Sequence, residues 1–241
     1  MVRPGHIRPQ VVVESGICMD SDFEEARRSV FAPGEVPQIL TAWVVLALAL
    51  SVTDIEGLLA GTGGNLVDIL AALVATATGF ILHEMGHKFV AMRRGYVAHF
   101  RVWAWGIALA LITALASQGQ FLFGAPGAVY IAPAAGALSY GAYALSQRSE
   151  KKDNAMISAA GPGTNLAFAL AFLLLVLALP TDSFWNTVTT YGFILNVGLG
   201  SFNMLPIPPL DGYKIFRGSL PLGLLIALPL WAMFAYLFLL P

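Results

Sequence analysis

The sequence is poor in charged residues and in cysteine. Only 11% of its 241 residues are charged, and Cys18 is the single cysteine, whereas soluble domains carry about 25% charged residues. One cysteine cannot form an internal disulfide, and it excludes a zinc site built from cysteines alone. The net charge of −1 does not favour a polyanionic partner, so we expect no binding of nucleic acid.

Hydrophobic residues dominate instead. They make up 57% of the chain, and the mean hydropathy is +0.73. Several apolar runs approach or exceed the roughly 20 residues that a helix needs to cross a bilayer. We therefore predict an all-α, multi-pass protein of the cell membrane, in contact with the lipid bilayer.

The distribution of apolar runs predicts the organisation of the chain. Residues 1–35 are polar, lack the apolar core of a signal peptide and are predicted to form an N-terminal arm, with a possible short helix at 20–28. Residues 36–241 are predicted to form one transmembrane domain. Five spans are expected in it, at about 36–52, 66–90, 154–179, 184–205 and 220–240.

Residues 99–147 permit two interpretations. They are apolar but interrupted by glycine and proline, so they could form two further spans, near 103–117 and 121–145. The β-prone pieces at 100–105 and 128–132 equally favour a re-entrant loop with β-structure between the second and third predicted spans. Such non-helical backbone is tolerated at membrane depth only where it is buried in protein or lines a wet cavity.

Basic residues predict the orientation. Lys and Arg residues occur at three junctions between the predicted spans. If the spans alternate in direction, these junctions lie on the same side of the membrane as the N-terminal arm, which has four arginines. The opposite junctions, 54–65 and 180–183, contain no Lys or Arg. The positive-inside rule then places the N-terminus in the cytoplasm. The three basic junctions are Arg93/Arg94, Arg148/Lys151/Lys152 and Lys214/Arg217.

A metal-binding pattern lies in the second predicted span. His83 and His87 are four residues apart, so a helix presents both imidazoles on one face, and Glu84 lies beside them. This HExxH arrangement is typical of two zinc ligands with a general base. Polar side chains inside a span are costly and indicate function. The helical rise places the pair about 12 Å from the cytoplasmic end at Arg93, so the site is expected nearer that face.

Catalytic zinc takes three protein ligands and leaves one position open. The other histidines, His6 and His99, lie outside the predicted spans, and Asp211 is the favoured third ligand. It follows a segment with three prolines, which cannot form regular helix, so it is expected on unwound backbone. Asp211-Gly212 is also a good turn dipeptide, which leaves an ordinary loop-capping role as the alternative.

Three motifs in order, HEMGH, GPGTN and NMLPIPPLDG, resemble the site-2 protease family of intramembrane metallopeptidases over about residues 65–215. The resemblance implies that Asp211 completes a site for one Zn²⁺ per chain. It also implies that Gly161 and Asn165 form the family's GxxxN motif, with Asn165 assisting the transition state, and that Asn203 lines the site. Many members carry a PDZ domain or a CBS pair, for which these 241 residues have no room.

The resemblance further implies that residues 99–131 supply β-structure that holds an extended substrate by strand addition. We therefore expect a zinc endopeptidase that cleaves membrane-protein substrates within or near their transmembrane helices, as in regulated intramembrane proteolysis. Glu84 would serve as the general base. The alternative is a non-catalytic membrane metal-binding protein or transporter, which would need further acidic or histidine residues along a path across the bilayer.

Overall fold

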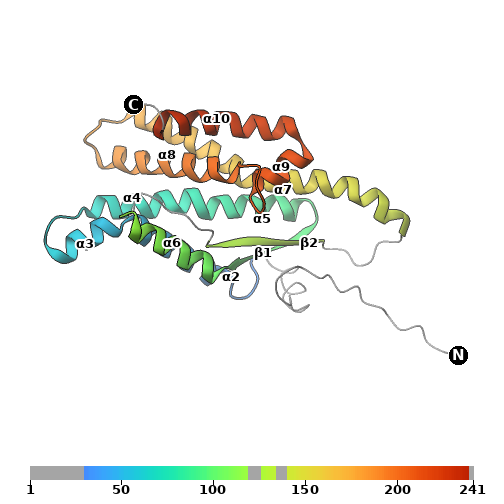
Figure 1. The fold of residues 1–241 in the computed structure, drawn as a ribbon, viewed down its shortest axis with the longest axis horizontal. Helices are drawn as coiled ribbons and strands as arrows, with labels where there is room; N and C mark the ends of the chain where they lie inside the picture. The colour runs from blue at the N-terminus through green and yellow to red at the C-terminus, as the bar shows by residue number, and fades with distance from the viewer. Residues whose placement is uncertain (1–29, 119–125, 134–139, 239–241) are drawn as a thin grey trace.

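The structure is a computed structural model, and it describes residues 30–118, 126–133 and 140–238. Cys18 and the predicted helix at 20–28 lie outside these ranges. The described chain is mostly helical, with one two-stranded antiparallel sheet (Figure 1). Its elements are α2 (Glu35–Leu50), α3 (Val52–Ala60), α4 (Leu66–Thr76), the π-helix η1 (Ala77–Ile81), α5 (Leu82–Arg93), β1 (Tyr96–Val102), α6 (Ala104–Ala116), β2 (Gly127–Pro133), α7 (Tyr140–Ala178), α8 (Phe184–Asn203), α9 (Asp211–Gly218) and α10 (Leu220–Phe238).

Among the described residues, three helical stretches are long and apolar enough to cross a membrane, namely Leu66–Arg93, Lys151–Ala178 and Leu220–Phe238. The helices α2 and α3, bent by 66° relative to each other, make a fourth if they form one broken span. The helix α8 coincides with another predicted span, but side chains such as Asn186 and Asn196 make it more polar than these stretches. The protein is thus a multi-pass membrane protein, while the count of five spans stays a prediction.

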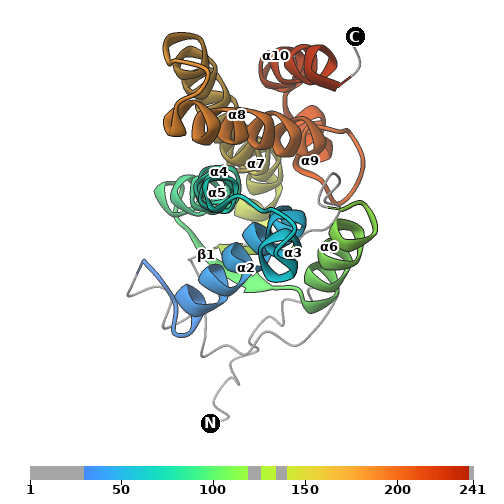
Figure 2. The same ribbon diagram turned by 90° about the vertical axis from the view of Figure 1, so that its left-hand side faces the viewer.

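The α4–η1–α5 span lies in the middle of the molecule. In Figure 2 it separates α2, α3 and α6 on one side from α7, α8 and α10 on the other. The helices α4 and α5 pack against α8 and α7 respectively, and α2 packs against α4. Side chains from α5 therefore face α7, which is far away in the sequence.

The predicted β-structure is present between the second and third predicted spans. Strands β1 and β2 pair antiparallel, with His99 opposite Tyr130. The β-prone piece at 128–132 lies wholly in β2, whereas the piece at 100–105 is strand only as far as Val102 and enters α6 from Ala104. The helix α6 has 13 residues, shorter than a span. The depth of this region in the bilayer stays a prediction.

Two boundaries differ from the sequence-based expectation. The basic segment 148–153, expected as a junction, lies inside α7, which begins at Tyr140. Its Lys, Glu and Arg residues are good helix formers, so helix continues through it. Glu35, expected at the end of the polar arm, is the first residue of α2 and is fully buried.

The Glu35 burial has a specific cause. Its carboxylate accepts hydrogen bonds from the Lys88 ammonium at 2.6 and 2.8 Å and from the Phe100 N–H at 2.9 Å. Lys88 is buried as well and also donates to the Ala98 carbonyl at 2.6 Å. One buried ion pair thereby joins α2, the metal-motif helix α5 and strand β1.

We predict that Glu35→Ala lowers the free energy of unfolding by about 3–5 kcal/mol, because it leaves the Lys88 ammonium buried without its counter-ion. Thermal unfolding of the detergent-solubilised protein measures this. The exposed Glu56 on α3 provides the control, since Glu56→Ala should change stability by less than about 0.5 kcal/mol. Equal unfolding temperatures for the two variants would show that the pair does not stabilise the fold.

Candidate metal centre

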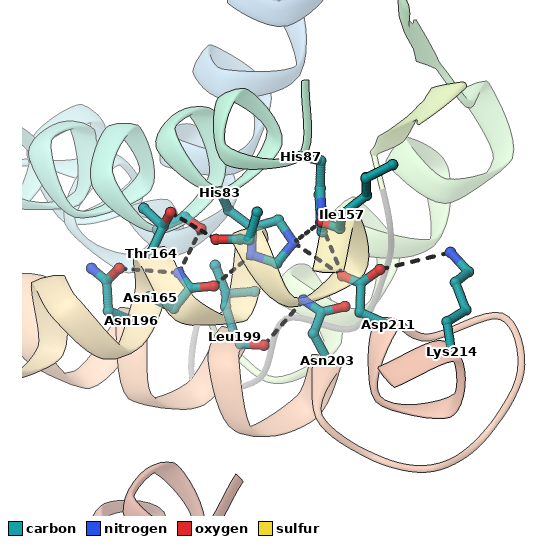
Figure 3. Close-up of polar contacts among 12 residues, drawn as sticks. His83, His87, Ile157, Thr164, Asn165, Asn196, Leu199, Asn203, Asp211 and Lys214 are labelled. Carbon is teal, nitrogen blue, oxygen red and sulfur yellow. Dashed lines mark hydrogen bonds and ion pairs between the residues drawn. The ribbon is translucent and has the colours of Figure 1, made fainter. Parts of the chain in front are cut away.

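The two motif histidines converge on one point. Both lie on α5 one turn apart, and their Nε2 atoms are 3.1 Å from each other. Asp211 approaches from α9, with its Oδ2 atom 3.0 Å from Nε2 of His87 and 3.5 Å from Nε2 of His83. Figure 3 shows the three side chains pointing toward one another. All three ligand atoms lie within 4.8 Å of one another, as a single bound ion requires.

Asp211 reaches this position because the chain leaves helix before it. The helix α8 ends at Asn203, and the following proline-containing segment has no regular structure up to Leu210. Asp211 itself is the first residue of α9 rather than part of an unwound stretch. Its other carboxylate oxygen, Oδ1, lies 3.7 Å from the Lys214 ammonium, so the two oxygens face different partners.

Hydrogen bonds at Nδ1, the ring nitrogen that lies away from Asp211, orient the two imidazoles. Nδ1 of His87 donates to the Ile157 carbonyl of α7 at 2.8 Å, and a carbonyl can only accept. Nδ1 of His83 lies 2.5 Å from Oδ1 of Asn165, also on α7. In each ring the remaining nitrogen, Nε2, faces Asp211. Such hydrogen bonds fix the tautomer and the direction of metal-binding histidines.

Glycine residues on α5 and α7 allow these two helices to pack closely against each other. A Cβ atom at Gly161 would lie 2.6 Å from Nε2 of His83 and would collide with the His87 ring. At Gly86, within HEMGH, a Cβ atom would lie 2.8 Å from Oγ1 of Thr164. Real Cβ atoms essentially never show such contacts, so the HEMGH and GPGTN motifs each contribute a glycine that the other motif's side chains require.

The donor set fits zinc. Two imidazole nitrogens and one carboxylate oxygen are the usual three protein ligands of a hydrolytic zinc site, which leaves a fourth position for water or substrate. Glu84 follows His83 on α5 and is buried. Among the residues that the structure describes, His83, His87 and Asp211 are the one group of three or more such side chains able to hold a metal ion.

The other predicted site residues take different places. Asn165 is fully buried, and its Nδ2 donates to the Gly79 carbonyl at 2.9 Å and to Oδ1 of Asn196 at 3.0 Å. Both of its amide protons are thus engaged, and a role in the transition state stays a prediction. Asn203, at the end of α8, donates from Nδ2 to the Leu199 carbonyl at 3.1 Å; its role in lining the site also stays a prediction.

The sequence-based predictions included neither Asn196 nor the π-helix. Asn196 is fully buried in the middle of α8, and a buried amide within an apolar helix was itself a usable signal. The π-helix η1 ends two residues before His83, the first residue of the metal motif. Nothing in its sequence, Ala-Thr-Gly-Phe-Ile, distinguishes it from ordinary helix.

Comparison with known proteins agrees with this site. The family model described as Peptidase family M50 matches residues 71–190. A protein of Methanocaldococcus jannaschii named "Putative zinc metalloprotease MJ0611" is 33% identical over 193 residues, which cover 80% of this chain and 93% of that protein. "Putative zinc metalloprotease Rip2" of Mycolicibacterium smegmatis is 28% identical over 187 residues, 70% of this chain and 67% of that protein. No solved structure gives a significant match.

Fold, site and comparisons together define a membrane metallohydrolase. The chain belongs to peptidase family M50, the family of site-2 proteases. It is a zinc metalloprotease. The prediction of an enzyme is therefore confirmed, in preference to the alternative of a non-catalytic metal-binding protein.

We predict that Asp211→Ala reduces the zinc content of the purified protein to less than about a tenth of the wild-type value, because two imidazoles alone hold zinc weakly. Atomic absorption after dialysis measures the content. Asp182→Ala, an exposed position between α7 and α8, is the matched control and should keep its zinc. Retention of zinc by Asp211→Ala would mean that another residue completes the site.

Proposed function

We propose that this protein is an intramembrane endopeptidase that hydrolyses peptide bonds within or near transmembrane helices of other membrane proteins. One observation carries the proposal: the metal ligands His83 and His87 lie inside the apolar stretch Leu66–Arg93, which is long enough to cross a membrane. The midpoint of the two ligands is eight residues before Arg93, which at the helical rise is about 12 Å from the end of that stretch. A soluble substrate would not reach such a depth easily, whereas a membrane helix is already there.

The proposed mechanism assigns a task to each side chain. When bound, zinc supplies the Lewis acid that polarises the scissile carbonyl and makes a water molecule acidic enough to react near neutral pH. Glu84 takes the proton of that water and transfers it to the leaving amine. His83, His87 and Asp211 hold the metal, and the Ile157 carbonyl keeps the His87 ring in place.

The strands suggest how the substrate is held. A helix hides its own backbone hydrogen-bonding groups, so it must unwind before hydrolysis, and an exposed strand edge can pair with the unwound segment. The outer edge of β1 is occupied: the Ala98 carbonyl accepts from Lys88, while the N–H groups of Phe100 and Val102 donate to Glu35 and Gln38. Pairing with a substrate therefore falls to β2.

The outer edge of β2 suits this task. Backbone groups alternate in direction along an antiparallel pair, so Val129 and Ile131, opposite Phe100 and Ala98, direct theirs away from β1. Within the described part of the chain neither has a partner for these groups. Val129 also packs against the buried cluster of Ala91, Ala98 and Ile157, and the Ile157 carbonyl holds His87, which supports binding of the substrate at this edge.

We further propose that the N-terminus is cytoplasmic and that the active site lies nearer the cytoplasmic face. The basic junctions support this, because Arg94 at the end of α5 pairs with Asp153 in the basic part of α7. Gly218, at the end of α9, packs against Ala155 of α7. The three Lys- and Arg-containing regions thus gather at one end of the molecule, as the positive-inside rule requires.

The proposed function predicts that Glu84→Gln keeps its zinc but loses at least about 100-fold of its cleavage rate, because the general base is gone and the ligands remain. Co-expression with candidate single-span membrane proteins, followed by immunoblotting for the shortened product, measures cleavage. Zinc content of the same preparation is the control. A Glu84→Gln protein that still produces the fragment would refute the assigned base.

The proposed pairing of the substrate with the outer edge of β2 leads to a separate prediction. Ile131→Pro removes an N–H that points away from β1, so it should leave the sheet and the zinc content intact. It should lower kcat/KM for a membrane substrate by about 10-fold, which corresponds to the loss of one hydrogen bond of about 1.4 kcal/mol. Ile131→Ala, which keeps the N–H, is the matched control. Equal kcat/KM for the proline and alanine variants would show that β2 does not pair with the substrate.

A further inference from the structure

A chain of buried amides lies behind His83. Asn165 of α7 and Asn196 of α8 are both fully buried. Asn165 contacts His83 through Oδ1 and the Gly79 carbonyl through Nδ2, and it donates to Oδ1 of Asn196 at 3.0 Å (Figure 3). Asn196 in turn donates from Nδ2 to the Gly192 carbonyl at 2.8 Å and to Oγ1 of Thr78 at 3.1 Å.

The direction of each amide in this chain is determined by acceptors that cannot be reversed. The carbonyls of Gly79 and Gly192 can only accept, so each must face an NH₂ group. That leaves Oδ1 of Asn196 for Asn165 and Oδ1 of Asn165 for His83. The proton of the neutral His83 ring is consequently on Nδ1, and the lone pair of Nε2 is directed toward Asp211 and the metal position.

The chain of amides contacts the π-helix η1. In a π turn the hydrogen bonds run from i to i+5 and the regular i to i+4 ladder is interrupted, and such turns are frequent at functional sites. The helix η1 contains both Thr78 and Gly79 and ends two residues before His83. Asn165 holds the Gly79 carbonyl and Asn196 holds the Thr78 hydroxyl, so two separate helices anchor the same turn.

We propose that Asn196 is a positioning residue of the zinc site, which acts through Asn165 to hold the His83 ring with Nε2 toward the metal. The inference rests on the zinc site but not on the substrate class. Without Asn196, one Nδ2 proton of Asn165 loses its acceptor, and the Asn165 amide is held at Nδ2 by the Gly79 carbonyl alone, so it can tilt away from His83. The hydrogen bond between Oδ1 of Asn165 and Nδ1 of His83 is then weakened, and the His83 ring loses part of the fixed direction that outer partners of metal ligands normally secure.

The test compares zinc affinity in Asn196→Ala and Asn186→Ala, measured by competition with a chromophoric chelator. Asn186 is the matched control because it is an asparagine on the same helix that also donates to α7, at the Val176 carbonyl, but it lies ten residues away from Asn196. We expect Asn196→Ala to bind zinc about 10–100-fold more weakly and Asn186→Ala to bind it like the wild type.

Two further measurements separate positioning from general stability. The visible absorption of the Co²⁺-substituted protein should change in Asn196→Ala and stay unchanged in Asn186→Ala, since it reports the ligand geometry directly. Thr78→Val removes the outer hydrogen bond of the chain, together with the bonds from the Thr78 hydroxyl to the Val74 and Ala75 carbonyls one turn before it. It leaves both amides in place and should therefore weaken zinc binding less than Asn196→Ala does. This milder variant also keeps the question answerable if Asn196→Ala fails to fold.

Wild-type zinc affinity and an unchanged cobalt spectrum in both Asn196→Ala and Thr78→Val would overturn the proposal. It would also be overturned if Asn186→Ala weakened zinc binding as much as Asn196→Ala, because the effect would then come from α7–α8 packing. Since none of these readouts uses a substrate, failure of the proposed intramembrane activity would leave them unaffected.

Discussion

A zinc site inside an apolar helix has to satisfy its polar groups without bulk water, and this constraint shapes the rest of the structure. Each imidazole of the motif needs an acceptor for Nδ1–H and an anion near Nε2. The α5 helix supplies neither, so α7 provides the Ile157 carbonyl and Asn165, and α9 provides Asp211. The tertiary arrangement of three helices is therefore what turns two histidines one turn apart into a metal centre.

Close packing makes those contacts possible. Hydrophobic driving force between helices is weak in lipid, and small residues allow the backbones to approach so that polar side chains can bond across the interface. Gly86 and Gly161 serve this purpose between α5 and α7. On the opposite side of α5, the ion pair between Lys88 and Glu35 fixes β1 and the start of α2. The metal helix is thus anchored on both sides.

The sequence predicted the local parts of the site better than its long-range parts. His83, Glu84 and His87 follow from helical spacing alone, and the β-prone residues 128–132 are strand as expected. The continuation of α7 through 148–153 was missed because charge was interpreted as an interruption, although those residues are good helix formers. The partner of Asn196 and the burial of Glu35 depend on which helices meet, and no local pattern contains that information.

The most direct test of this account is mass spectrometry of a single-span membrane peptide co-reconstituted in liposomes with the purified zinc-loaded protein. New termini are expected within or at the edge of the peptide's apolar segment, and they should disappear when a chelator removes zinc and return when zinc is restored. Cleavage confined to soluble flanks, or cleavage that persists without the metal, would contradict it.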